Sequence, residues 1–279
     1  MSEPADPRLR QSFDNWRKRA PVWDDWADRI EKLARGLNAP LLEAAGLAPG
    51  QTVLDLASGA GEPALSLARA VGPDGRVTAT DLVPEMLQGA RRRAEAQGCD
   101  NIRFEVADMQ ALPFPDAAFD RVTCRLGLMY APDADKALRE ARRVLKPGGR
   151  AVYVVWGPQE NNTQFLVSDS VLEEVLGLDP HEGGFEPTRF AAPGSLTGPL
   201  RQAGFAEAEE IEFQRQPELD PDSGFWRSQV EMRVGEDFQA LSAADRERLD
   251  AAMREAFEAY RVDDRIRLSV HARLAVATA

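Results

Sequence analysis

Residues 52–67 read TVLDLASGAGEPALSL, and this stretch decides the fold of the chain. Its apolar start is typical of a buried strand, and the strand pattern ends in a small-residue turn at 57–61. A helical pattern follows, with Pro63 at an early position. A strand, a glycine turn and a helix in this order place a nucleotide-like ligand at the carboxyl edge of an α/β sheet. The glycines let the backbone approach that ligand where a Cβ atom would collide.

Strand and helix patterns alternate from residue 50 to residue 157. This alternation predicts a parallel, doubly wound sheet with right-handed crossovers. The predicted strands are 53–57, 76–80, 102–107, 119–124 and 150–156, and the predicted helices are 63–71, 84–97 and 134–145. The later pattern predicts helices at 161–176, 195–203 and 243–261, an edge strand at 206–214 and a last strand at 265–278.

The N-terminal segment carries a tryptophan-rich helical pattern. We expect the first dozen residues to be loose and residues 21–46 to form one or two amphipathic helices. The apolar residues at helical spacing are Trp23, Trp26, Ile30, Leu33 and Leu37. Such a helix either packs on the sheet or forms a lid whose tryptophans face the ligand, and both interpretations stay open. The predicted domains are a helical lid at 1–46 and a ligand-binding domain at 47–279, with cap insertions at about 177–194 and 217–262.

The composition argues against several classes of protein. A nucleic-acid groove needs clustered Lys and Arg, whereas the net charge is −12 and the one basic cluster, 91–93, is predicted to be a solvated helix face. Two cysteines and two histidines give neither a disulfide framework nor a metal site. The chain starts without an apolar targeting segment, and no run reaches the roughly 18 apolar residues of a membrane span. We therefore expect a cytoplasmic protein with no membrane span and no nucleic-acid partner.

Acidic residues recur where the first three predicted strands end. Asp55 precedes the glycine turn, Asp81 ends the second strand, and Asp108 ends the third. A carboxylate at Asp81 can accept two hydrogen bonds from a ribose diol, and Asp108 with the next backbone N–H can read an adenine edge. A single Asp in such a place often serves only its turn. Three in this order indicate an adenosine site.

Glu62 discriminates between two kinds of adenosine ligand. Residues 59–64 read GAGEPA, which satisfies the dinucleotide pattern G-x-G-x-x-A. A pyrophosphate, however, would sit at the helix N-terminus, where the Glu62 carboxylate would repel it. A ligand with ribose and adenine but no phosphate tolerates Glu62. S-adenosylmethionine, with its sulfonium and its zwitterionic amino-acid end, is such a ligand.

Four stretches resemble class I S-adenosylmethionine-dependent methyltransferases in their order and spacing: VLDLASGAGEPALSLA, VTATDLVPEML, VADMQALPFPDAAFDRV and LKPGGR. The set is similar above all to the methyltransferase type 11 branch, which includes ubiquinone/menaquinone-biosynthesis C-methyltransferases and many small-molecule methyltransferases. The resemblance covers about residues 50–157. It implies a Rossmann-like, seven-stranded, mostly parallel sheet with an antiparallel last strand, helices on both faces and a helical cap.

The resemblance also implies S-adenosyl-L-methionine as the cofactor and assigns its contacts. The turn backbone would hold the methionine part, Asp81 the ribose hydroxyls, and Asp108 the adenine amino group. The implied cofactor-binding residues are Asp55, Ala57, Ser58, Gly59, Gly61, Asp81, Leu82, Met86, Ala107, Asp108, Met109, and the backbone of Arg125 and Leu126.

An activated methyl donor leaves the protein mainly to align the acceptor and to exclude water. A general base is needed only for some acceptors, and the candidates are Tyr130 and His181. Ordinary packing is the alternative for Tyr130, and a solvated loop position is the alternative for His181. His271 is predicted to be structural because it alternates with apolar neighbours in the last strand, and Cys124 because no paired base stands near it in the sequence.

Recognition of the methyl acceptor falls to the segments that the resemblance does not cover. The substrate-binding candidates are Trp16, Trp23, Tyr130, Phe225 and Trp226. These aromatic residues predict a small, partly apolar metabolite, unless they simply pack on the sheet. The accepting atom and the oligomeric state stay open, with a homodimer as one option. The alternative functions are an NAD(P)-binding oxidoreductase and an S-adenosylmethionine-binding protein that transfers no methyl group.

Overall fold

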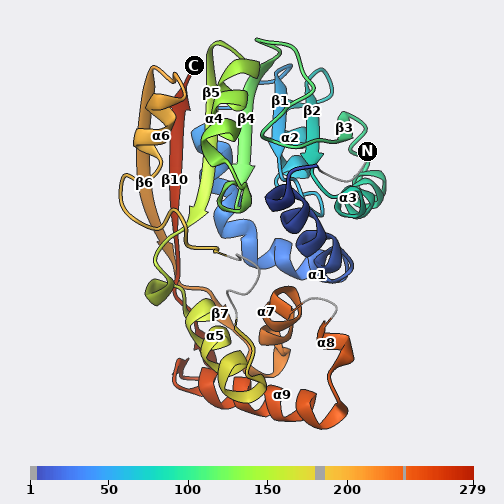
Figure 1. The fold of residues 1–279 in the computed structure, drawn as a ribbon, viewed down its shortest axis with the longest axis vertical. Coiled ribbons are helices and arrows are strands. Elements are labelled where there is room, and N and C mark those ends of the chain that lie inside the picture. The colour runs from blue at the N-terminus through green and yellow to red at the C-terminus, as the bar shows by residue number, and fades with distance from the viewer. Residues whose placement is uncertain (1–4, 180–185, 235–236) are drawn as a thin grey trace.

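A seven-stranded sheet forms the centre of the molecule, with the strand order β3-β2-β1-β4-β5-β10-β6 (Figure 1). The structure is a computed structural model that describes residues 5–179, 186–234 and 237–279, with the backbone alone at 28–35, 229, 233–234, 237 and 239. The strands of this sheet are β1 (Thr52–Leu56), β2 (Arg76–Asp81), β3 (Ile102–Val106), β4 (Phe119–Arg125), β5 (Leu145–Trp156), β6 (Glu207–Arg215) and β10 (Val270–Thr278).

The pairing within the sheet confirms the expected Rossmann-like fold. β1 to β5 run parallel, and β10 runs antiparallel to both β5 and β6. β5 is buried on both sides, as a central strand must be: Val152 and Val154 enter one core cluster, whereas Tyr153 and Val155 enter the other.

Helices cover both faces of the sheet. α1 (Pro7–Ala45) and α2 (Ala64–Val71) pack in one core cluster, and α4 (Ala134–Val144) and α6 (Thr197–Gln202) pack in the other. α3 (Pro84–Ala96) links β2 to β3, and the short 3-10 turn η1 (Leu128–Tyr130) follows β4. Of the stretch 177–194, the described residue Phe190 packs in the cluster of α4.

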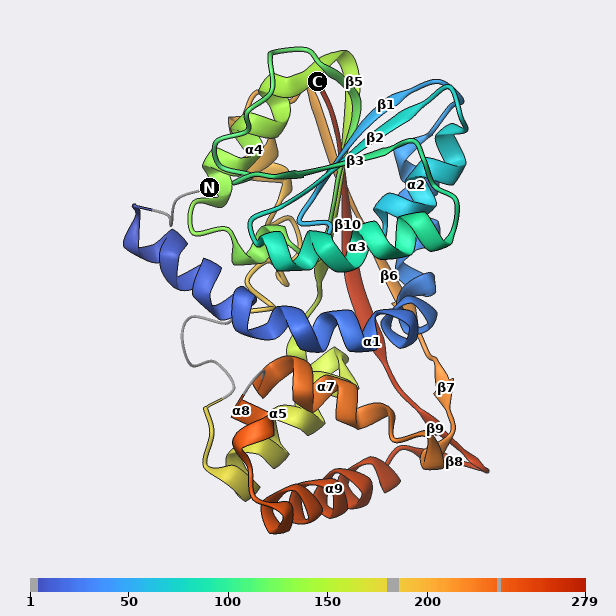
Figure 2. The same cartoon turned by 90° about the vertical axis from the view of Figure 1, so that its right-hand side faces the viewer.

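A second group of elements, which we call the cap, lies beyond the carboxyl edge of the sheet (Figures 1 and 2). Its apolar residues form a separate core cluster that joins three of its helices. The cap consists of α5 (Thr163–Leu176), α7 (Phe225–Val234), α8 (Asp237–Ala240), α9 (Ala243–Glu258), the small sheet of β7 (Glu218–Leu219), β9 (Arg265–Arg267) and β8 (Arg261–Val262), and the 3-10 turns η2 (Gln159–Asn161) and η4 (Pro221–Ser223).

α1 crosses between the sheet and the cap, as Figure 2 shows. The expectation that the first dozen residues are loose is wrong, because this helix already begins at Pro7. The Asp6 carboxylate accepts a hydrogen bond from the Arg8 N–H at 2.9 Å, and a proline fits the first helical position. Phe13 and Trp16 then pack against the start of α3 through Val83.

The predicted last strand, 265–278, is interrupted. β9 belongs to the cap and β10 to the central sheet, so the chain changes sheets at Leu268 and Ser269. The Leu268 N–H donates to the Pro217 carbonyl at 3.0 Å, and the Ser269 N–H donates to the Thr163 hydroxyl at 2.9 Å. Among the described helices, none has the length and the apolar run that crossing a membrane requires.

Candidate active site

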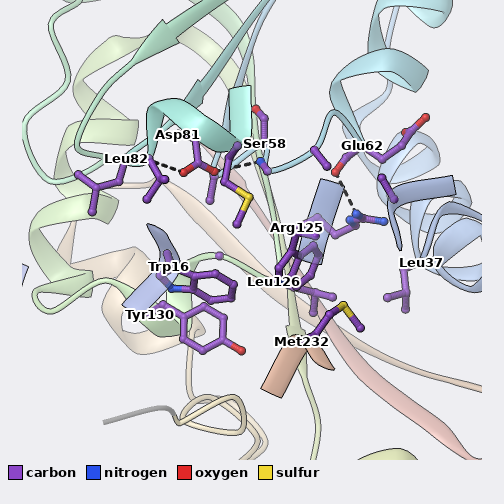
Figure 3. A pocket seen from close by; sticks show the side chains of 18 of the residues that line it. Trp16, Leu37, Ser58, Glu62, Asp81, Leu82, Arg125, Leu126, Tyr130 and Met232 are labelled. Atoms are coloured by element: carbon purple, nitrogen blue, oxygen red, sulfur yellow. Dashed lines mark hydrogen bonds between the residues drawn. The ribbon is translucent and has the colours of Figure 1, made fainter. Parts of the chain in front are cut away.

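A cavity of about 260 Å³ opens at the carboxyl edge of the sheet, under α1 and against the cap (Figure 3). It lies next to β1 and β4, where the strand order reverses, and this is the usual ligand position in doubly wound sheets. Residues from α1, the turn after β1, the ends of β2, β3 and β4, and the cap all line it. The lining is mostly apolar. Figure 3 shows its polar side chains, Ser58, Asp81, Glu62 and Arg125, on one side, which we call the polar half, and Trp16, Tyr130, Leu126 and Met232 on the other, which we call the apolar half.

The turn after β1 presents its backbone to the polar half. Ala57 and Gly59 have φ angles of 51° and 52°, in the left-handed region that a glycine adopts readily. The Ser58 N–H donates to the Thr80 carbonyl at 2.8 Å, which holds the turn against β2. A Cβ atom on Gly127 would lie 2.4 Å from the Cβ of Ala57, so only glycine at that position lets the turn seat on the end of β4.

Asp81 joins the turn to α3. Its Oδ2 accepts the Gly59 N–H at 3.0 Å, and its Oδ1 accepts the Val83 N–H at 2.9 Å (Figure 3). Burial raises the pKa of this carboxyl to about 6, although the backbone N–H groups oppose the rise. Each carboxylate oxygen can accept more than one hydrogen bond. Asp81 lines the cavity, so a ligand can reach it.

Asp108 is oriented by a residue that the sequence did not single out. Its Oδ1 accepts hydrogen bonds from the Gln110 backbone N–H at 2.9 Å and from the Gln110 side-chain amide at 3.0 Å. The Gln110 Oε1 in turn accepts the Asp133 N–H at 2.7 Å. Asp108 lies close to Asp81, because the Ala107 N–H donates to the Asp81 carbonyl at 3.0 Å.

Arg125 and Glu62 are joined at another part of the polar half, through the Glu62 carbonyl and through Asn38. The Arg125 guanidinium donates to the Asn38 Oδ1 and to the Glu62 carbonyl, each at 2.9 Å. The Glu62 carboxylate accepts hydrogen bonds from Asn38 at 2.9 Å and from Ser66 at 2.7 Å. Sequence reasoning used only the backbone of Arg125 and missed Asn38, which belongs to the distant α1. A cationic and an anionic side chain therefore line the same end of the cavity.

Arg93 fastens α1 over the site. Its guanidinium donates to the Asp24 carboxylate at 3.0 Å, to the Asp24 carbonyl at 2.6 Å and to the Ala60 carbonyl at 3.2 Å. The prediction of a solvated face at 91–93 is therefore wrong for Arg93, whose side chain is only 17% exposed. A Cβ atom on Gly89 would lie 2.2 Å from the Asp24 Oδ1, so the glycine makes room for this contact.

Aromatic rings form one wall of the apolar half. The ring of Trp16 meets Tyr130 edge-on at 4.9 Å and Trp23 at 5.9 Å between centroids. On the cap side, Phe225 and Met232 line the same space. The indole N–H of Trp26 donates to the Glu231 carboxylate at 2.6 Å, which ties α1 to α7. α1 thus covers part of the cavity, with contacts to both sheet and cap.

Most of the sequence-predicted residues line this cavity, and a few do not. Those that line it are Ala57, Ser58, Gly59, Asp81, Leu82, Met86, Ala107, Asp108, Met109, Arg125, Leu126, Trp16, Trp23, Tyr130 and Phe225. Asp55, beneath the turn, and Gly61, which ends the turn and faces Leu65 and Ala90, do not line the cavity. Trp226 follows Phe225 on α7 and so faces another way: its indole donates to Asp250 at 2.8 Å in the cap core. His181 lies outside the described residues.

Asp55 is fully buried beneath the turn. Its Oδ1 accepts the Thr123 hydroxyl at 2.6 Å, and burial raises the pKa of the carboxyl to about 7. Cys124 next to it is equally buried, and burial raises the pKa of its thiol to about 12, so it is no thiolate nucleophile. His271 is buried on β10 with its Nε2 2.5 Å from the Glu212 carboxylate. Within the described part of the chain, no group of three His, Cys, Asp or Glu side chains could hold a metal ion.

Comparison with known proteins identifies the family. Residues 53–149 match the family described as "Methyltransferase domain". The demethylmenaquinone methyltransferase of Thermus thermophilus is 40% identical over 171 residues, which are 57% of this chain and 76% of that protein. The chain belongs to the S-adenosylmethionine-dependent methyltransferases. S-adenosyl-L-methionine is its cofactor, as the resemblance implied.

Other methyltransferases are similar over shorter or more divergent alignments. The ubiquinone/menaquinone biosynthesis C-methyltransferase UbiE of Hahella chejuensis is 41% identical over 121 residues, 43% of this chain and about half (49%) of that protein. The fold is shared with a putative methyltransferase of Bacillus halodurans, with a TM-score of 0.58 at 23% identity over 86% of this chain and 97% of that one. The family match and the Thermus and Hahella relatives support methyl transfer and not the nicotinamide oxidoreductase or the non-methylating binder, whereas the Bacillus structure shows the fold alone.

The polar half of the cavity fits the methyltransferase cofactor. It offers carboxylates at the ends of β2 and β3, and it brings Glu62 and Arg125 to one end. A zwitterionic amino-acid group matches such a pair, whereas a pyrophosphate would face the Glu62 carboxylate.

Replacing Asp55 with Asn tests whether its carboxyl resists ionisation in the fold. Because burial raises its pKa from 3.8 to about 7, the stability that the neutral carboxyl provides is complete below pH 3.8 and is lost as the pH rises through 7. We expect Asp55→Asn, whose amide stays neutral, to gain stability relative to the wild type over this window, by up to about 4 kcal/mol. Thermal unfolding across the same range measures this gain.

The matched control is Asp74→Asn, in the exposed turn after α2, for which we expect no pH-dependent difference. A difference between Asp55→Asn and the wild type that stays constant with pH would contradict a buried, neutral carboxyl.

Proposed function

We propose that this methyltransferase acts on a small, partly apolar acceptor that binds in the apolar half of the cavity. The observation that supports it is the division of one cavity: charged and hydrogen-bonding groups lie on one side, and the rings of Trp16 and Tyr130 lie on the other (Figure 3). The same division separates the two reactants, so that the cofactor's methyl group can face the acceptor.

When bound, S-adenosylmethionine supplies a methyl group that is already activated by the cationic sulfonium. The residues proposed to hold it are those of the polar half. Asp81 would accept the ribose hydroxyls, and Asp108 with the Met109 N–H would recognise the adenine edge. Arg125 would bind the carboxylate and Glu62 the ammonium of the amino-acid end. All five positions line the cavity.

The remaining work of the protein is to align the acceptor and to exclude water. Proper alignment in a closed site can lower a barrier by about 7–11 kcal/mol in favourable cases. α1 closes the site, and we propose that it acts as a lid held by Arg93 at one point and by Trp26 at another. Desolvation by the aromatic wall would raise the reactivity of a nucleophilic acceptor atom.

Tyr130 is the proposed general base for acceptors that lose a proton in the reaction. It follows β4 in the turn η1 and lines the cavity. In Figure 3 its hydroxyl points away from Trp16, towards the side where Leu126 and Met232 lie. The phenol can orient an acceptor by a hydrogen bond even where no base is needed.

The named relatives support a ring-shaped acceptor. The Thermus thermophilus relative is named a demethylmenaquinone methyltransferase, and the Hahella chejuensis relative is named for ubiquinone and menaquinone biosynthesis. A cavity half lined by aromatic and aliphatic side chains suits such a ring. We further propose a cytoplasmic enzyme with no nucleic-acid partner, which the net charge of −12 favours. A homodimer is one option for the assembly of this enzyme.

Asp81→Ala tests the ribose contact. Losing hydrogen bonds to a charged group typically weakens binding by about 1.5–3 kcal/mol, so we expect S-adenosylhomocysteine to bind at least about tenfold more weakly. Titration calorimetry measures the affinity, and circular dichroism verifies the fold. The exposed Asp74→Ala is the control with unchanged affinity.

Two ligands that differ only in the ribose 2′-hydroxyl distinguish a lost ribose contact from a disturbance of the turn after β1. The wild type should prefer adenosine to 2′-deoxyadenosine, and Asp81→Ala should remove this preference. An unchanged preference in the variant would refute the ribose assignment, and tight binding of NAD by the wild type would refute the exclusion of a pyrophosphate at Glu62.

Arg125→Met tests recognition of the amino-acid end. We expect the wild type to bind S-adenosylhomocysteine more tightly than 5′-methylthioadenosine, which lacks that end, and the variant to lose about tenfold or more of this ratio. The affinity for 5′-methylthioadenosine itself should stay the same. Both values come from titration calorimetry.

Arg121→Met is the matched control, since Arg121 also lies on β4 but donates to the Ala45 and Gly46 carbonyls at the end of α1. A ratio that is unchanged in Arg125→Met would show that the carboxylate is bound elsewhere.

A further inference from the structure

Gln164 is a polar residue that the cap contributes to the lining of the cavity. It is the second residue of α5 and is 8% exposed. Phe165 and Trp156 also line the cavity, and their rings meet edge-on at 5.1 Å. Within the described chain, no residue forms a hydrogen bond with the Gln164 side-chain amide.

The amide of Gln164 is open to the cavity, because neither its nitrogen nor its oxygen is among the fully buried polar atoms that lack a hydrogen-bond partner in the described chain. The neighbouring buried amide is bonded within the protein: the Asn162 side chain accepts the His271 N–H at 2.9 Å and donates to the Pro158 carbonyl at 2.9 Å. Buried polar side chains nearly always have such a partner. Gln164 has none in the described chain and borders the cavity, so a ligand there can supply the hydrogen bonds in place of water.

The position of Gln164 is fixed by the residues before it. The Thr163 N–H donates to the Ser269 carbonyl at 3.1 Å, and the Ser269 N–H donates back to the Thr163 hydroxyl at 2.9 Å. The His271 N–H donates to Asn162, as above, so the start of α5 is bonded to the chain entering β10 at two successive residues. These hydrogen bonds fix the start of α5, so the backbone that carries Gln164 is preorganised for a ligand.

We propose that Gln164 selects the methyl acceptor by hydrogen bonding to a neutral oxygen on its apolar ring. The inference rests on the proposed function, since it assumes that the acceptor occupies the apolar half. A primary amide both donates and accepts, so it can serve a hydroxyl or a carbonyl oxygen. The amide carries no net charge that could pair with a charged group, and this favours a neutral oxygen.

The test compares two probes of nearly the same shape, 2-naphthol and 2-methylnaphthalene, which differ in a hydroxyl and a methyl group. Equilibrium dialysis measures their binding in the presence of saturating S-adenosylhomocysteine. We expect the wild type to prefer 2-naphthol and Gln164→Leu to lose about tenfold of that preference. Gln164→Met, whose side chain is longer than that of leucine, should lose the preference for 2-naphthol to the same extent. Binding of 2-methylnaphthalene should persist in both variants, which also verifies that the cavity is intact.

Gln159→Leu is the matched control, because the Gln159 amide donates to the Asp169 carboxylate at 2.8 Å and does not line the cavity. It should keep the wild-type preference. If the wild type binds both probes equally, or if Gln164→Leu keeps the preference, the role of Gln164 is refuted while the apolar acceptor site stands. If the wild type binds neither probe although it binds S-adenosylhomocysteine, the apolar acceptor site is refuted and the role of Gln164 with it.

Discussion

The Asp81 carboxylate, shared between the Gly59 and Val83 N–H groups, is the interaction on which the site depends. It holds the turn after β1 against the start of α3, and the Asp81 carbonyl also receives the Ala107 N–H at the end of β3. Three strand ends are thus fixed around one residue. Burial raises the pKa of this carboxyl to about 6, because the charged form loses solvation there. A ligand that hydrogen-bonds the carboxylate offsets part of that loss.

α1 covers this polar edge and part of the cavity beside it. Along its length it is bound to α3 through Asp24 and Arg93, to α7 through Trp26 and Glu231, and to the end of β4 through Asn38 and Arg125. These contacts lie at the adenosine side, at the cap and at the amino-acid end of the proposed cofactor position. Opening α1 would therefore disturb both halves of the cavity together, which suits a lid that admits both reactants.

Sequence periodicity predicted the central sheet well, because each strand and helix shows its own local pattern. It also predicted Asp81 and Asp108, since residues that end successive parallel strands meet at one edge. It could not predict Asn38, Gln110 or Gln164, which reach the site only through the packing of distant segments. The local pattern gave a wrong prediction where a distant segment covers a residue. The pattern around Arg93 is typical of a solvated helix face, but in the structure α1 packs there and Arg93 binds Asp24. The sequence around Phe225 and Trp226 does not indicate which of the two faces the cavity.

The most direct test of the account is a crystal structure of the complex with S-adenosylhomocysteine. We expect adenosine between Asp81 and Asp108, the amino-acid carboxylate at Arg125, and the sulfur facing the space between Tyr130 and the cap. An adenosine bound elsewhere, or a sulfur directed away from that space, would contradict the division of the cavity into a cofactor half and an acceptor half.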